Sequence, residues 1–198
     1  MPVSAGRGLV LAVVSAATFG TSGALAASLL DAGWTPAAAV TARLGLAVLV
    51  LVVPALLQLR GRWQQLRRSR TAVLVYGVAA VAGAQLCFFN AVAHVSVGVA
   101  LLMEYSGALL VVGWLWARHG QRPRRLTVTG AALAVAGMVL VLDLAGDHRV
   151  ALPGVLWGMG AAVGLAVYYV LSADVDDALP PMAMVTGGLV VGVVVLLV

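Results

Sequence analysis

Seven long apolar segments constrain the fold of this 198-residue chain more than any other feature. Each is close to the 17–25 residues, roughly, that a helix needs to cross the hydrocarbon core of a bilayer. A mean hydropathy of +1.07 and a charged fraction of only 10% exclude an ordinary soluble domain. The sequence therefore predicts an all-α, polytopic membrane protein, with spans at residues 8–30, 37–59, 72–93, 97–117, 126–144, 154–172 and 182–198.

Arginine predicts the orientation of these spans. The chain has twelve basic residues, all arginine, and nine of them lie in two inter-helix loops: Arg60, Arg62, Arg67, Arg68 and Arg70 in one, Arg118, Arg122, Arg124 and Arg125 in the other. Positively charged loops stay in the cytoplasm. Both loops and the N-terminus with Arg7 are therefore expected on the cytoplasmic side of the inner membrane. The same rule accounts for the net charge of +5 without a nucleic-acid partner.

A weak internal repeat links the two ends of the chain. Gly8 opens the first segment and Gly154 the sixth, and the following helices contain Ala-Val-Thr at 39–41 and Met-Val-Thr at 184–186. Five spans per repeat make the second copy enter the membrane from the opposite side, as in secondary transporters. We expect residues 1–145 to form a first five-helix repeat and 146–198 the first two helices of an inverted second one, which three more helices would complete. Two unrelated Gly/Ala-rich helices remain the alternative.

Only two ionisable residues lie well inside the predicted spans, Arg43 in the second and Glu104 in the fourth. Counted from the outer ends of their segments, both lie about 9–11 Å deep, in one layer. Isolated charges at that depth are costly, so we expect a direct or water-bridged pair, or a shared water-filled cavity. A buried ion pair that only fixes helix register is the alternative.

Uncharged polar residues in the spans are candidates for the same cavity. They are Ser15, Thr18 and Ser22 in the first span, Gln85 and Asn90 in the third, and Tyr105 beside Glu104. Helix hydroxyls often bond the carbonyl four residues back instead. Tyr168 faces the cavity if the repeat is real, and otherwise forms an interfacial aromatic belt with Tyr169. His94 lacks further donors, so no metal site and no cofactor are predicted.

Several stretches resemble the EamA family of the drug/metabolite transporter superfamily, ten-helix permeases built from two five-helix repeats. They read GLVLAVVSAATFGTSGALAASLL, PAAAVTARLGLAVLVLV with Arg43, SVGVALLMEYSGALLVVGWLWAR, RRLTVTGAALAVAGMVLVL and GVLWGMGAAVGLAVYYVLS. Glu-Tyr-Ser-Gly at 104–107 is similar to a Glu-Phe-x-Gly-Pro element in the branch that exports amino acids such as threonine and homoserine. Ala108 replaces that proline, and the acid that many members carry near the fourth loop is absent from Arg118-His119-Gly120, so the resemblance does not transfer the substrate.

The predicted function is that of an inner-membrane secondary transporter, and not an enzyme. It would export a small metabolite, amino acids first, by alternating access coupled to a proton or ion gradient, since no nucleotide-binding loop is present. Glu104 would alternate between a protonated state and one engaged with Arg43 or substrate. The alternatives are a structural or assembly membrane subunit, and an intramembrane lipid-modifying enzyme, which would usually need more acids, a metal or a nucleophile. The expected partners are the bilayer and a small-molecule substrate. A homodimer is possible on the sequence.

Overall fold

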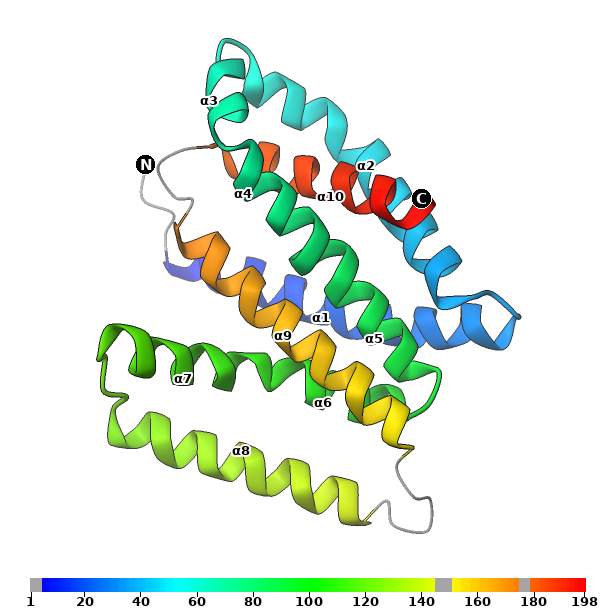
Figure 1. The fold of residues 1–198 in the computed structure, drawn as a ribbon, viewed down its shortest axis with the longest axis vertical. Helices are drawn as coiled ribbons and strands as arrows, with labels where there is room; N and C mark the ends of the chain where they lie inside the picture. Colours follow the sequence, from blue (N-terminus) through cyan, green and yellow to red (C-terminus); the bar gives the residue numbers. More distant parts are fainter. Residues whose placement is uncertain (1–4, 145–150, 175–178) are drawn as a thin grey trace.

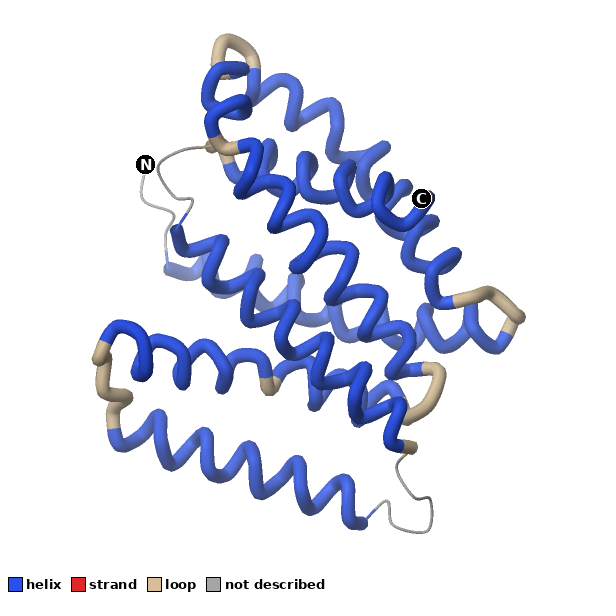
Figure 2. The backbone as a smooth tube through the Cα atoms, viewed as in Figure 1, coloured by secondary structure: helices blue, strands red, loops and turns tan. Residues whose placement is uncertain are grey.

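The computed structural model describes residues 5–144, 151–174 and 179–198, and these residues contain helices and connecting turns but no strand (Figure 2). The elements in chain order are α1 (Ala5–Asp31), α2 (Pro36–Leu59), α3 (Trp63–Arg68), α4 (Arg70–Val75), η1 (Tyr76–Gly83), α5 (Ala84–Val92), α6 (Val97–Tyr105), α7 (Gly107–His119), α8 (Arg125–Leu144), α9 (Leu152–Asp174) and α10 (Pro181–Leu197). The all-α fold class is confirmed, and a helix covers each apolar segment that the sequence predicts.

The spans differ in how completely they match a membrane-crossing helix. Four in the described part of the chain are long and apolar enough to cross a bilayer: Pro36–Leu59, Arg70–Val92, Val97–His119 and Leu152–Ser172. The apolar stretches Arg125–Leu140 and Pro181–Leu197 are shorter. The predicted third span is built from α4, η1 and α5 in direct succession, and the fourth from α6 and α7.

Local sequence explains where the helices begin and end. Thr35 has extended backbone angles and its hydroxyl accepts a hydrogen bond from the Ala38 N–H at 3.2 Å, while Pro36 occupies the first turn, where its missing N–H costs nothing. Gly120 ends α7 with φ at +64°, a conformation that a side chain would resist. These signals fix the residue at which α2 begins and the residue at which α7 ends.

The packed centre of the bundle is formed by α5, α9, α10, η1 and α2. Figure 1 shows α9 running beside α5, and the contacts of α10 are with α2 and η1. Small residues allow these approaches: a Cβ at Gly107 would collide with the Ala162 carbonyl oxygen of α9, and a Cβ at Gly164 would meet Ala84 of α5. In contrast, α8 leaves large apolar side chains such as Leu126 and Leu133 exposed, as expected for a face in contact with lipid.

A cavity between α2, η1, α5, α6, α9 and α10

One cavity of about 580 Å³ collects most of the polar side chains that the sequence singles out. Its walls come from α2, η1, α5, α6, α9 and α10, so it lies in the packed centre of the bundle. The lining residues are Arg43, Leu44, Ala47, Tyr76, Ala80, Val81, Ala84, Gln85, Glu104, Tyr105, Leu165, Tyr168, Tyr169, Val185 and Leu189. This volume lies within the range of small-molecule sites, about 300–1,000 Å³.

Arg43 and Gln85 form a side-chain hydrogen bond that joins two spans at this cavity. The Arg43 Nη1 donates to Gln85 Oε1 at 2.9 Å, from α2 to α5. Both side chains are partly buried. Because a guanidinium carries five N–H donors, this bond holds the group in place and leaves donors for another acceptor.

Glu104 lies on α6 at the same cavity and is 2% exposed. Its Oε2 has no hydrogen-bond partner among the described residues. The charges of Glu104 and Arg43 act on each other, yet Arg43 donates to Gln85 rather than to this oxygen. The cavity therefore holds a cation fixed by a hydrogen bond and an acid with acceptor capacity to spare.

Tyrosines surround the other side of the cavity. The rings of Tyr76 and Tyr168 lie 5.8 Å apart at an angle of 41°, and those of Tyr168 and Tyr169 lie 5.6 Å apart at 67°. Both separations suit favourable aromatic contacts. Tyr105 extends from α6 to the same cavity. The aromatic rings supply apolar contact area, and their hydroxyls supply further hydrogen-bonding groups.

Both irregular stretches among the described spans border this cavity. Residues 76–83 form a π-helix, whose wider turns place Tyr76, Ala80 and Val81 on the cavity wall. The fourth span is interrupted at Ser106, directly after Glu104 and Tyr105, and Figure 2 shows this interruption between two helical stretches. The Ser106 hydroxyl donates to the Met103 carbonyl at 2.6 Å and so satisfies one of the freed groups. Such breaks within membrane helices recur where backbone borders a binding cavity.

Three of the candidate residues do not reach the cavity. The Thr18 hydroxyl donates to the Val14 carbonyl at 2.9 Å, and Thr18 and Ser22 are not part of the lining. Asn90 is likewise outside it, and its Nδ2 donates to the Leu86 carbonyl of its own helix at 2.8 Å. Helix α1 packs close to the start of α6, where a Cβ at Gly23 would meet Val97. The side chain of Ser15 is not among those that the structure describes.

Sequence reasoning missed two members of the site. Tyr76 is 3% exposed and contacts Tyr168, but nothing in the apolar third span distinguishes it as a cavity residue. The sequence places Tyr169 in an interfacial belt and leaves Tyr168 open between that belt and the cavity; in the structure both line the cavity.

The arrangement can hold a small polar molecule. Arg43 offers donors, Glu104 an acceptor, and the tyrosines a partly apolar wall. In the described part of the chain, no group of three or more His, Cys, Asp or Glu residues converges on a point where a metal ion would bind.

Apolar helices that line a cavity with a fixed cation and an acid define a polytopic helical membrane protein with a polar internal site. The chain matches the EamA-like transporter family over residues 6–143, well over half of its length, and it belongs to that family. It is also similar to a UPF0060 membrane protein of Paracidovorax citrulli (strain AAC00-1), with 35% identity over 99 residues, which are 47% of this chain and 86% of that relative. No solved structure matches significantly. Family membership indicates a membrane transporter of the drug/metabolite type.

Proposed function

We propose that this protein is a secondary transporter that exports a small metabolite, with amino acids as the first candidates, and that the cavity between α2, η1, α5, α6, α9 and α10 is its substrate site. The observation that supports this most strongly is that one cavity holds both Arg43, fixed by Gln85, and Glu104, with an unpartnered oxygen. A zwitterionic amino acid complements this pair, because its carboxylate matches a guanidinium and its ammonium matches a carboxylate.

The two charged residues have different roles in this proposal. Arg43 binds the substrate carboxylate, since its position is held by the bond to Gln85. Glu104 binds either the substrate ammonium or a proton, because an ionised carboxylate without a partner is costly at this depth. Competition between proton and substrate for one carboxylate couples export to a proton gradient without any nucleotide.

Alternating access would come from two inverted repeats, of which residues 1–145 form the first and residues 146–198 the first two helices of the second. The contact between α2 and α10, the second helices of the two repeats, is the kind expected near a pseudo-twofold axis. The proposal includes an inner-membrane location with the N-terminus in the cytoplasm, as the arginine-rich loops favour.

Transport by the full-length protein in proteoliposomes tests this proposal. Radiolabelled threonine serves as the first probe, followed by other amino acids in competition. We expect Arg43→Ala to reduce uptake by at least about tenfold, because a charged hydrogen bond contributes on the order of 1.5–3 kcal/mol. Glu104→Gln is expected to abolish stimulation by an imposed pH gradient. Asp31→Asn, which removes an exposed acid at the end of α1, is the control and should transport like the wild type.

Wild-type rates and wild-type pH dependence in both Glu104→Gln and Arg43→Ala would contradict the assignment of the site. Retained function after replacing both residues with apolar ones would instead identify a structural subunit. Chemical conversion of lipid in detergent, without vesicles, would identify an enzyme.

A further inference from the structure

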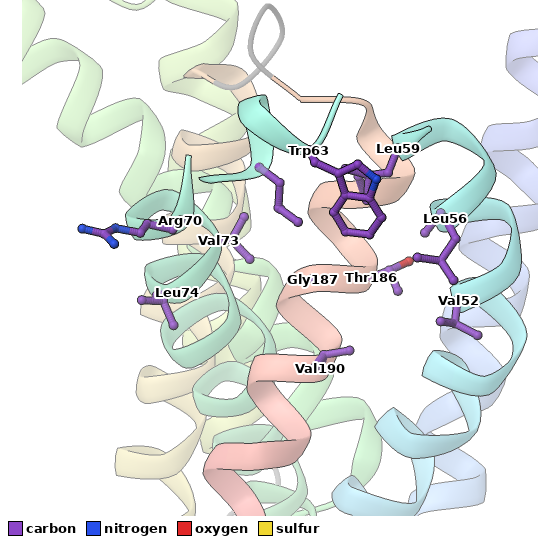
Figure 3. Close-up of a pocket in the computed structure, with 13 residues that line it drawn as sticks. Val52, Leu56, Leu59, Trp63, Arg70, Val73, Leu74, Thr186, Gly187 and Val190 are labelled. Carbon is purple, nitrogen blue, oxygen red and sulfur yellow. The ribbon is translucent and has the colours of Figure 1, made fainter. Parts of the chain in front are cut away.

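A second pocket lies away from the candidate substrate site, where α2, α3, α4 and α10 meet beside the first arginine-rich loop. Its volume is about 410 Å³, and nearly all the side chains around it are apolar. Figure 3 shows the Trp63 ring over the gap between α2 and α10, with Val52 and Leu56 on one side and Val190 below. The pocket has the size of a ligand site, about 300–1,000 Å³, but its lining suits a hydrocarbon chain.

One polar group in this pocket has no partner. Thr186 on α10 is 6% exposed, and its Oγ1 has no hydrogen-bond partner among the described residues. Figure 3 shows Thr186 projecting from α10 toward Val52 and Leu56 of α2. Elsewhere in the chain such hydroxyls bond their own helix: Thr41, the repeat counterpart of Thr186, donates to the Ala37 carbonyl at 2.8 Å. A buried hydroxyl left free is costly, so this one is suited to bond a ligand in the pocket.

The rim of the pocket carries strong positive charge. The short helix α3 directs Trp63 and Leu66 to the pocket, whereas its arginines Arg67 and Arg68 are exposed. Arg70 lines the pocket with its stem, and its guanidinium extends away from the apolar interior (Figure 3). The loop contains no acid between residues 60 and 70. Clustered arginines beside the end of a membrane span attract anionic headgroups.

We propose that this pocket binds an anionic phospholipid, with one acyl chain between α2 and α10, an ester carbonyl at the Thr186 hydroxyl and the phosphate among the arginines of the α2–α4 turn. The three features of the pocket match the three parts of this molecule. The apolar interior takes the chain, the unpartnered hydroxyl donates to the ester, and the cationic rim binds the headgroup while the Arg70 stem stays in apolar surroundings.

Native mass spectrometry of the purified full-length protein tests the proposal. The probes are dioleoyl phosphatidylglycerol, which is anionic, and dioleoyl phosphatidylcholine, which has the same chains and no net charge. We expect one phosphatidylglycerol to bind about tenfold more tightly than phosphatidylcholine. Val190→Phe fills the pocket and should lower that affinity by about tenfold. Val194→Phe, one turn further along α10 and outside the lining, should leave it unchanged.

Charge and hydroxyl variants test the remaining two contacts. Arg67→Gln, Arg68→Gln and Arg70→Gln together should remove the preference for the anionic lipid. The same three-charge change at Arg122, Arg124 and Arg125 in the other arginine-rich loop should preserve it. Thr186→Val keeps the shape of the side chain and should weaken binding of both lipids by about fivefold.

Equal affinity for the two lipids in the wild type would overturn the proposal. Equal loss of preference in the two triple variants would also overturn it, because general charge attraction would then explain binding. If Val190→Phe has a lowered unfolding temperature, its loss of lipid affinity could come from misfolding. The comparison of Thr186→Val with the wild type then decides whether the pocket binds the lipid. Unchanged affinity of Thr186→Val for both lipids would then show that the hydroxyl does not bind the lipid, and the proposed binding in this pocket would be rejected.

Discussion

At the scale of single residues, the hydrogen bond between Arg43 and Gln85 orients the cation of the cavity, and the sequence does not predict this bond. Two opposite charges in one membrane layer predict a direct or water-bridged pair, or a shared cavity. In the structure both residues line one cavity, where Arg43 donates to Gln85 and leaves Glu104 Oε2 unpartnered. A closed ion pair satisfies both partners and has little capacity for a third group. The arrangement with Gln85 orients the cation and leaves the carboxylate available.

Removing the acceptor that orients Arg43 is the sharpest residue-scale test. Gln85→Ala should raise the KM for threonine by about tenfold with a smaller change in the maximal rate, because the guanidinium loses its fixed position but keeps its charge. Asn90→Ala, on the same helix, is the matched control, since Asn90 bonds only within α5 in the described structure and lies outside the cavity lining. Initial rates in proteoliposomes measure both. An equal effect of the two substitutions would show that α5 packing, and not the orientation of Arg43, is what matters.

At the scale of elements, close helix contacts and irregular turns position the site. The contact of α7 with α9 at Gly107 lies three residues from Glu104 and directly after the interruption at Ser106. The backbone of α9 approaches so closely there that any side chain at 107 meets the Ala162 carbonyl oxygen. The interruption and the contact together set where Glu104 points.

Two glycines on α7 therefore respond differently to alanine. Gly107→Ala should destabilise the protein by about 1–3 kcal/mol, because the new methyl collides with backbone that cannot move aside cheaply. Gly113→Ala should be neutral or slightly stabilising, since nothing lies within 4 Å of its added Cβ and alanine favours helix. Thermal unfolding in detergent, followed by circular dichroism, compares them. Similar unfolding temperatures for both variants would contradict the contact.

The π-helix η1 is the second element that shapes the cavity. On a regular α-helix the nine steps from Tyr76 to Gln85 make about two and a half turns, so the two side chains would lie on opposite faces. The wider turns of η1 change this angle, and both residues line the cavity.

Deleting one residue from η1 should preserve this alignment, because a π-helical turn holds one residue more than a regular α-helical turn. If the segment becomes α-helical after deletion of Val78, which is exposed, eight steps of about 100° leave Tyr76 about 80° from Gln85, on the same side. We expect transport within about threefold of the wild type, with helix content retained by circular dichroism. Val78→Ala is the control and should transport normally. A loss of transport by about tenfold or more in the deletion variant, with normal transport by Val78→Ala, would show that the alignment of Tyr76 with Gln85 is not what η1 provides.

At the scale of the whole molecule, the sequence predicts the helices and the depth of the charged layer but not which helices meet. Arg43 and Glu104 could be assigned to one layer because depth follows from counting residues along a helix of known rise. Thr18 and Ser22 lie outside the cavity lining, and counting along the helix cannot show this because the lateral neighbours of α1 depend on packing. Tyr76 was missed because no sequence pattern signals a π-helix.

The arginine pattern makes a prediction about the molecule as a whole, namely that both arginine-rich turns face the same side of the membrane. Short loops rich in arginine remain in the cytoplasm because moving them across the bilayer against the membrane potential is unfavourable. An even number of crossings separates the turn after α2 from the turn after α7 if the third and fourth spans each cross once. The turns after α1 and α5 should then lie on the opposite side.

Cysteine labelling in intact cells measures this topology. Cys87, the chain's single cysteine, is replaced by alanine, and single cysteines are then placed at exposed residues of the turns. Ala32→Cys and His94→Cys should react with a membrane-impermeant maleimide added outside. Gln64→Cys and Gln121→Cys should react only after the membrane is permeabilised, because they lie beside the two arginine clusters. External labelling at one of these glutamine positions and not at the other would break the alternation of spans, and with it the proposal that the second repeat enters the membrane inverted.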